Sequence, residues 1–333
     1  MVRNNRNLMK TLFGLLLAAM LVVTSACGVN KEAENQQPPE TNLANSAANK
    51  PEETKDAATQ ATVYPYTIKD DTGTEITFEQ QPTKVVTLVP SETETIYAIG
   101  AGEQVVGVDQ WSDYPEEAAA KPRVGDMTTN IEAVVALNPD LVLASSTLNT
   151  DAIAKLRELK IPVYASDPLT YDAVIAKLEI LGHIMNKPAD AAEIADHMRQ
   201  VRQQVTDAVK NAERKKVYME FSPGWTVGSG TFLDELLNLA GGINISAASQ
   251  GWFEVSAEEV VAQDPELIIY PDLKEDPNPI VTGIESRPGW DVIAAVKNKQ
   301  LHAVTENPLV RVGPRLADGL LELAKVIHPD LVK

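Results

Sequence analysis

The sequence contains little cysteine, histidine or basic charge. It has one cysteine and four scattered histidines in 333 residues. These counts exclude a disulfide framework and a cysteine-ligated zinc site, and they argue against a zinc or manganese site built from converging histidines. Lysine and arginine total 29 against 47 aspartate and glutamate residues, for a net charge of −18. A nucleic-acid binder needs basic surface to displace counterions from phosphates, so we expect no nucleic-acid partner.

Several motifs of catalysis and cofactor binding are also missing. The chain has no G-x-x-x-x-G-K-[ST] phosphate loop, no H-E-x-x-H pair and no G-x-S-x-G turn. The glycines between Gly224 and Gly230 lack dinucleotide-binding spacing, and we expect a glycine-rich loop there. No paired catalytic groups follow the expected strands. The sequence therefore predicts a protein that is not an enzyme and holds no cofactor or metal, rather than a surface hydrolase or metalloenzyme.

The first 26 residues have the pattern of a secretory signal. Three basic residues precede an apolar run of 12 residues that ends at Val23. This run is too short to span a membrane, and the small residues after it are typical of a cleavage site. Cys27 follows and resembles the lipidated cysteine of bacterial lipoproteins, although Thr24 replaces the usual leucine three places before it. The alternative is a plain secreted protein in which Cys27 is buried.

The region after Cys27 is polar. Residues 28–62 are rich in Asn, Gln, Pro, Ala, Glu and Lys, which cannot bury enough apolar surface to order the chain. We therefore predict that 27–62 is a lipidated cysteine followed by a disordered tether. Loss of residues 1–26 removes three positive charges and changes the net charge from −18 to −21. Such acidity suits a protein held beside an anionic lipid surface without adhering to it.

From Val63 onward, short apolar runs alternate with helical patterns, which indicates α/β architecture. We expect Ser91 and Glu94 to form a capping box on a helix that opens at Pro90. The other expected elements are a hairpin at 63–68 and 75–78 and strands at 84–89 and 105–108.

An internal repeat indicates two similar lobes. Residues 130–143 match 256–269 at a constant offset of 126, and both copies read as cap residue, helix, proline, acid and apolar strand. We predict an N-terminal lobe at 63–188 and a C-terminal lobe at 215–333. Between them, apolar residues recur at helical spacing over 189–214, which predicts one bridging helix of roughly 38 Å.

Five segments together resemble a known family. The chain is similar over about residues 80–330 to the periplasmic-binding-protein family that serves importers of cobalamin, ferric siderophores and haem. The resemblance implies two Rossmann-like α/β lobes bridged by a single long helix, with the ligand cleft between the lobes. The segment from Trp111 to Pro115 and the pair Gly251-Trp252 look most similar to cobalamin-binding members. The segments that carry the resemblance are 85–94, 105–115, 138–142, 240–244 and 313–315.

Four aromatic residues are candidates for contact with a ligand. Trp111, Tyr114, Trp225 and Trp252 fall in loops near strand ends, where α/β proteins place ligands, and their faces suit a large flat macrocycle. Trp111 and Trp252 also match aromatic cleft positions of the family. The alternative for all four is packing between the lobes. We assign Trp290 to the core.

Two arginines near the C-terminal end are also candidates. Arg311 matches a position that contacts ligand in cobalamin-binding members, and a guanidinium can bind amide oxygens, phosphate or carboxylate. Arg315 begins the last helix, and its alternative role is to anchor that helix.

Glu132 and Glu258 occupy equivalent places in the repeat, two residues after a capping residue. By the resemblance, one glutamate on each lobe pairs with arginines of the transmembrane permease dimer. The alternative is stabilisation of the helix dipole, and the two roles are compatible.

The sequence thus predicts a monomeric, lipid-anchored solute-binding protein on the outer face of a Gram-positive cell membrane. It would capture a metal-chelate small molecule, specifically a cobalamin-like corrinoid, and deliver it to the permease of an ATP-driven importer. A ferric siderophore or haem is the alternative ligand. A surface adhesin is an alternative of another class, which a ligand titration would separate.

Overall fold

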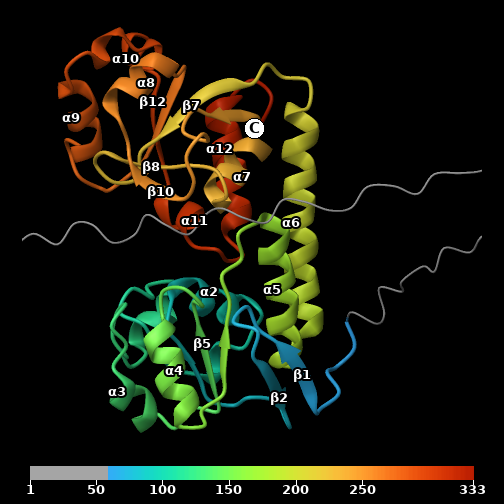
Figure 1. Cartoon of the computed structure of the whole chain (residues 1–333). Helices are drawn as coiled ribbons and strands as arrows, with labels where there is room; N and C mark the ends of the chain where they lie inside the picture. The colour runs from blue at the N-terminus through green and yellow to red at the C-terminus, as the bar shows by residue number, and fades with distance from the viewer. Residues whose placement is uncertain (1–58) are drawn as a thin grey trace, which may run out of the picture. The chain divides into compact units, whose positions relative to one another are not determined.

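The computed structural model describes residues 59–333. The predicted signal peptide, Cys27 and residues 27–58 of the predicted tether lie outside this range. Residues 59–333 belong to one compact unit, which contains two α/β lobes (Figure 1). Among residues 59–333, no helix is both long and apolar enough to cross a membrane.

The N-terminal lobe is built on a four-stranded parallel sheet. Its strand order is β4-β3-β5-β6, and helices α2 to α5 accompany it together with an antiparallel hairpin of β1 and β2. The strands are β1 (Tyr66–Lys69), β2 (Glu75–Phe78), β3 (Val85–Thr87), β4 (Val105–Val108), β5 (Leu141–Ala144) and β6 (Val163–Ala165). The helices are α2 (Pro90–Ala98), η1 (Gly102–Gln104), η2 (Glu116–Ala120), α3 (Ile131–Ala136), α4 (Thr150–Glu158) and α5 (Tyr171–Ile184).

The C-terminal lobe repeats this plan. Its parallel sheet has the order β12-β11-β7-β9, and a separate antiparallel ribbon joins β8 to β10. The strands are β7 (Lys215–Met219), β8 (Trp225–Val227), β9 (Gly242–Asn244), β10 (Trp252–Glu254), β11 (Leu267–Pro271) and β12 (Leu301–Val304). The helices are α7 (Phe232–Leu239), α8 (Ala257–Gln263), α9 (Pro279–Ser286), η3 (Trp290–Val292), α10 (Ala294–Lys297), α11 (Glu306–Val310) and α12 (Leu316–Ile327).

The internal repeat corresponds to a repeated topology. Asn130 caps α3 by accepting a hydrogen bond from the amide of Ala133, and Ser256 caps α8 through the amide of Glu259. The strands that follow, β5 and β11, each have a neighbour on both sides, with β3 and β7 as the equivalent inner partners. The prediction of two Rossmann-like lobes is therefore confirmed.

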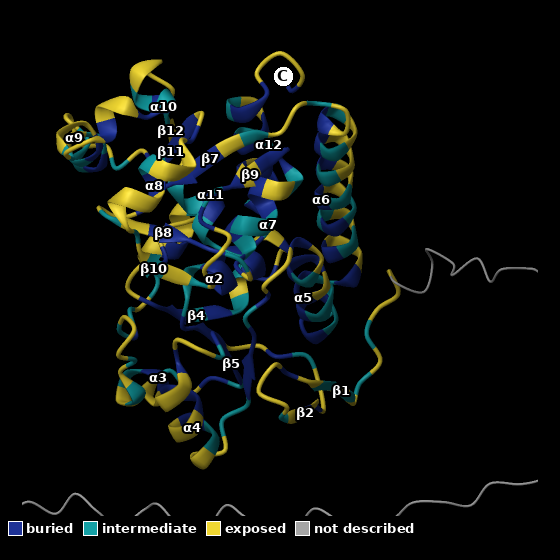
Figure 2. Cartoon of the chain, turned by 45° about the horizontal axis from the view of Figure 1, so that its top comes forward, coloured by how far each residue is buried: buried dark blue, intermediate teal, exposed yellow. Residues whose placement is uncertain are grey.

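Both faces of each sheet are covered, which explains why the strands read as continuous apolar runs (Figure 2). Successive residues such as Val85 and Val86 enter different core clusters. The cluster that contains Val85 continues through α5 and the bridging helix to Val217 of the C-terminal sheet. The lobes therefore share one apolar core along this side.

The bridging helix is α6 (Pro188–Val209). It starts one residue before the predicted range 189–214 and ends five residues earlier. It contacts α5 of the N-terminal lobe and both α7 and α12 of the C-terminal lobe. The apolar stripe that predicted it is buried at Met198, Val201 and Val205. One helix thus packs against both lobes.

Three local expectations differ from the structure. Ser91 and Glu94 do not form a capping box, because the N-cap of α2 is Val89 with no side-chain cap and Glu94 bonds to the other lobe. The glycine-rich segment is not a loop throughout, since Trp225–Val227 pairs with β10. Thr62, assigned to the tether, donates a hydrogen bond from its hydroxyl to the carbonyl of His183.

The close approach of α5 and α6 gives a stability prediction. Gly182 of α5 is buried, and a methyl group there would overlap Cβ of Ala191 on α6. We expect Gly182→Ala to lower the unfolding free energy by about 1–3 kcal/mol through overpacking. A Cβ added at Gly283 of α9 would meet only Nη2 of Arg287, at an ordinary contact distance of 3.6 Å, so Gly283→Ala should raise stability by up to about 1 kcal/mol through helix propensity. Denaturant unfolding measures both, and equal effects would contradict the packing argument.

Candidate functional site

The candidate residues gather where the two lobes meet. We call the region where the lobes meet the seam. Strands β3 and β4 of the N-terminal parallel sheet end there, with their carboxyl ends towards the C-terminal lobe. The C-terminal lobe contributes the β8–β10 ribbon and the connecting segment 311–315 between α11 and α12. These segments carry all five predicted ligand-contact residues.

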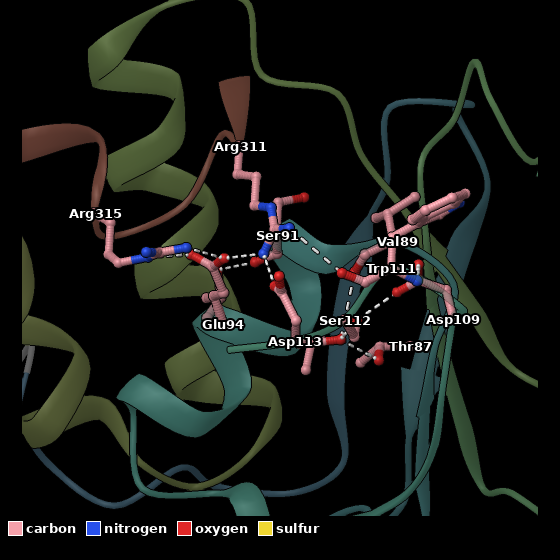
Figure 3. A network of polar contacts seen from close by, with 12 residues as sticks. Thr87, Val89, Ser91, Glu94, Asp109, Trp111, Ser112, Asp113, Arg311 and Arg315 are labelled. Atoms are coloured by element: carbon pink, nitrogen blue, oxygen red, sulfur yellow. Dashed lines mark hydrogen bonds and ion pairs between the residues drawn. The ribbon is translucent and has the colours of Figure 1, made fainter. Parts of the chain in front are cut away.

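Two arginines of the connecting segment bind one buried carboxylate of the other lobe (Figure 3). Glu94 of α2 has a side chain only 2% exposed. Arg311 Nη1 lies 2.8 Å from Glu94 Oε1, and Arg315 bonds to both oxygens at 2.8 and 2.5 Å. Arg311 also donates to Asp113 at 2.6 Å and to the carbonyl of Trp111 at 3.3 Å. These charge-assisted hydrogen bonds fasten the connecting segment to the N-terminal lobe.

Electrostatic interactions favour the charged forms of Arg311 and Asp113. Burial alone would lower the pKa of Arg311, but the hydrogen bonds and charges of Asp113 and Glu94 outweigh it and raise that pKa. Burial would likewise raise the pKa of Asp113, yet the hydrogen bond and charge of Arg311 lower it overall. Arg311 therefore already has two carboxylate partners within the protein.

Trp111 is held by the loop that follows β4. Buried Asp109 accepts hydrogen bonds from the Trp111 amide at 2.7 Å and from the Ser112 hydroxyl. Arg123 closes the loop by donating to the carbonyls of Asp109 and Ser112 at 2.8 and 2.7 Å. Burial raises the pKa of Asp109 despite these hydrogen bonds, which lower it. The Trp111 side chain, in contrast, is exposed, and 63% of the residue is accessible.

Trp225 and Trp252 share a face of the β8–β10 ribbon. The antiparallel register pairs Trp225 with Glu254 and Trp252 with Val227. Because alternate residues of a strand point to the same side, both indoles and Glu254 lie on one face, with the indoles diagonal to each other. Each tryptophan is nearly half exposed. Trp252 also meets Phe221 edge to face, with ring centroids 6.3 Å apart.

A second buried glutamate supports this ribbon. Glu220 directly follows β7 and is fully buried. It accepts two hydrogen bonds from the Arg287 guanidinium at 2.5 and 2.6 Å, one from Tyr218 and one from the amide of Gly224, the residue before β8. Arg287 in turn lies over the ring of Trp290, which is buried as predicted.

Tyr114 lies beside a cavity of about 670 Å³ at the seam. The guanidinium of Arg315 stacks over its ring at 4.0 Å. Arg315 and Pro314 close the cavity from the C-terminal lobe, and Glu94, Tyr97 and Lys121 are among its N-terminal lining residues. Of the five predicted ligand-contact residues, this cavity includes Tyr114 alone. The exposed tryptophans therefore belong to a surface outside the cavity.

The sequence analysis missed the residues that hold the site together, namely Glu94 in its observed role, Asp113, Glu220 and Arg287. A charged residue immediately after an apolar strand, as at Glu220, is the signal that could have suggested a buried ion pair. Within residues 59–333, no group of three or more acidic, histidine or cysteine residues could hold a metal ion.

Glu132 and Glu258 lie in the first turns of α3 and α8, each at the second helical position. Both are exposed. In the described part of the chain neither forms an ion pair, so both carboxylates are available to a partner.

Comparison with known proteins places this geometry among solute-binding proteins. The family model described as periplasmic binding protein matches residues 85–308. The ABC transporter substrate-binding lipoprotein YvrC of Bacillus subtilis is 34% identical over 81% of this chain and 88% of its own. A cobalamin-binding protein of Halobacterium salinarum is 31% identical over 81% of this chain and 76% of its own.

Solved structures agree. The vitamin B12-binding protein BtuF of Vibrio cholerae superposes with a TM-score of 0.67 at 29% identity, covering 74% of this chain and 96% of that one. The heme-binding protein RhuT of Roseiflexus has the same TM-score at 26% identity, over 74% of this chain and 98% of its own.

The buried cluster at the seam gives a second prediction. Glu94→Gln removes the charge that two arginines share, and breaking a buried pair in this way should destabilise the protein by about 3 kcal/mol. Glu179 of α5 pairs with Arg199 at the surface, where both side chains are about 40% exposed. Glu179→Gln is the matched control, with an expected loss below about 1 kcal/mol. Thermal and denaturant unfolding measure the stability of both variants. Similar losses of stability would show that the seam cluster contributes little to the stability of the fold.

Proposed function

The chain belongs to the periplasmic binding protein family, and from this premise we propose that it is the lipid-anchored binding protein of an ABC importer for a cobalamin-like corrinoid. It is a solute-binding protein rather than an enzyme. The cobalamin and vitamin B12 binders among its relatives support the ligand class, and the lipoprotein YvrC supports an anchor at Cys27. The anchor would hold the protein at the outer face of the membrane.

The observation that carries the ligand proposal is the placement of the exposed indoles. Trp111 projects from a firmly bonded loop of one lobe, and Trp225 and Trp252 share a ribbon face of the other. Large aromatic faces held by buried anchors suit a broad, flat ligand such as a corrin ring.

Charge at the seam favours the same ligand over an anionic chelate. Arg311 and Arg315 are bound to Glu94, and Arg311 is also bound to Asp113. A siderophore carboxylate or a haem propionate would have to compete with these carboxylates for a guanidinium. The amide groups of a corrinoid carry no net charge and need only hydrogen bonds.

The test is direct binding. Residues 28–333 are mixed with excess cyanocobalamin and desalted, and the visible spectrum of the protein fraction is recorded. We expect a stoichiometric corrinoid band. A colourless fraction would contradict the proposal, and haem and ferric siderophores would then be tried on the same column.

The tryptophan contacts can be tested separately. We expect Trp111→Ala and Trp252→Ala each to weaken cyanocobalamin binding by about 30-fold or more, as for central aromatic contacts of an interface. Leu159→Ala removes an exposed apolar side chain at the end of α4 and serves as the control, with unchanged affinity. Isothermal titration measures all three, and wild-type affinity in both tryptophan variants would exclude the indoles from the site.

Delivery to the permease is the second part of the proposal. We propose that Glu132 and Glu258, exposed at equivalent helix starts, contact basic residues of a permease dimer, because a repeated acidic pair complements a two-fold partner.

Charge reversal tests this docking. The double variant Glu132→Lys/Glu258→Lys should lose ligand uptake in cells by at least about tenfold while keeping its ligand affinity. The control Glu158→Lys/Glu193→Lys makes the same change of charge at two exposed acids outside the repeat. Uptake at the wild-type rate in the first double variant would refute docking through these glutamates.

A further inference from the structure

A buried ammonium group lies in the seam between the lobes. Lys177 belongs to α5, and its side chain is 3% exposed. Its Nζ lies 2.8 Å from Glu92 Oε1 on α2 and 2.9 Å from the backbone carbonyl of Val312. Val312 is part of the connecting segment 311–315 of the C-terminal lobe. One ammonium group thus joins two helices of the N-terminal lobe to the backbone of the other lobe.

This arrangement is poorly explained by stability alone. Two charges withdrawn from water are favourable only where further hydrogen bonds complete their shells, and apolar residues of similar size often serve as well. Glu92 is 1% exposed, yet its Oε2 has no hydrogen-bond partner. The ion pair is therefore incompletely satisfied. What an apolar pair could not supply is a donor to the Val312 carbonyl.

The position of Val312 controls the arginines beside it. Val312 immediately follows Arg311, and Arg315 comes three residues later. The next residue, Gly313, packs closely on α2, where an added Cβ would lie 3.3 Å from the Ser91 carbonyl. A shift of this backbone would move Arg311 away from the Trp111 carbonyl and from Asp113, which it contacts now.

Lys177 differs from the arginines in how it makes this connection. Arg311 and Arg315 reach Glu94 through long side chains that are 12% and 21% exposed, and such side chains can follow a moving lobe. Lys177 is almost fully enclosed and binds the backbone itself. It therefore restricts the position of the connecting segment more tightly.

We propose that Lys177 is a positioning residue, which holds the connecting segment on the N-terminal lobe in the ligand-free protein. Lys177 thereby fixes where Arg311 contacts the Trp111 loop. Glu92 supplies the opposite charge beside the buried ammonium. The inference concerns the relation of the lobes in the free protein, and only its affinity arm rests on the proposed function.

The experiment measures the distance between lobes in the absence of ligand. The only cysteine of the chain is Cys27, so residues 28–333 with Glu158→Cys and Lys297→Cys accept two spin labels, one on each lobe. Pulsed electron paramagnetic resonance should give one narrow distance distribution for the otherwise unchanged protein. The variants are Lys177→Met, which leaves the buried carboxylate without a partner, and Glu92→Leu/Lys177→Met, which replaces both charged side chains with apolar ones.

If Lys177 is a positioning residue, these variants should affect protein stability and the distance between the lobes differently. Lys177→Met should lose stability because it leaves Glu92 buried without its partner. The double variant should regain most of that stability, yet still show a broadened or shifted distance distribution, because no donor replaces the ammonium at the Val312 carbonyl. If Lys177→Met fails to fold, the double variant decides alone. A double variant with the distance distribution of the unchanged protein would overturn the proposal.

A second arm measures ligand binding. The double variant should bind cyanocobalamin about tenfold more weakly, in line with the loss of one hydrogen bond to a charged group. The matched control is Glu179→Gln/Arg199→Met, which removes the exposed ion pair between α5 and α6 and should change neither readout. If the unchanged protein binds no cobalamin, the proposed ligand fails while the distance measurement still tests Lys177. Unaltered affinity in a double variant whose distances have changed would show that the segment does not set the ligand site.

Discussion

A carboxylate withdrawn from water must be neutralised by its neighbours, and within residues 59–333 the ion-pair partners of Glu94 all belong to the other lobe. Its two arginines lie more than 200 residues away in the sequence, on the segment that joins α11 to α12. The same guanidinium groups contact Asp113, the carbonyl of Trp111 and the ring of Tyr114. Many of the polar contacts across the seam thus come from the two arginines that neutralise this one acid.

The C-terminal lobe also contains a buried acid, which it neutralises with a residue of its own. Glu220 is fully buried after the inner strand β7, and it is neutralised by Arg287 of the same lobe. Glu220 also accepts a hydrogen bond from the amide of Gly224 and so fixes the start of the ribbon that carries Trp225. In both lobes, therefore, a buried acid just after a strand fixes the backbone that carries an exposed indole: Asp109 after the edge strand β4 binds the amide of Trp111, and Glu220 after the inner strand β7 binds the amide of Gly224. The buried charged residues thus fix the positions of the exposed aromatic side chains.

Sequence patterns predicted most of the fold because helices, strands and the repeat are recognised from residues that are close in the sequence. The repeat at 130–143 and 256–269, the apolar runs and the stripe over α6 each report the environment of neighbouring residues, and the structure confirms them. The site was harder to predict. The spacing of Ser91 and Glu94 fits a capping box, but the Glu94 carboxylate binds arginines that are distant in the sequence instead of capping the helix. Glycines around Trp225 suggested a loop, although pairing with β10 creates a strand. Both differences come from partners far away in the sequence, which local spacing does not reveal.

The four tryptophans of the chain divide into two optical classes. Trp290 is enclosed against Tyr218 beneath Arg287, whereas Trp111, Trp225 and Trp252 face solvent. Indoles in water emit at longer wavelengths than indoles in an apolar interior. A coloured ligand bound to the exposed indoles, as proposed, would quench the red-shifted emission by energy transfer more strongly than the blue-shifted emission. Under the proposed function, the exposed indoles would then report ligand occupancy and Trp290 would serve as the internal reference, without any attached dye.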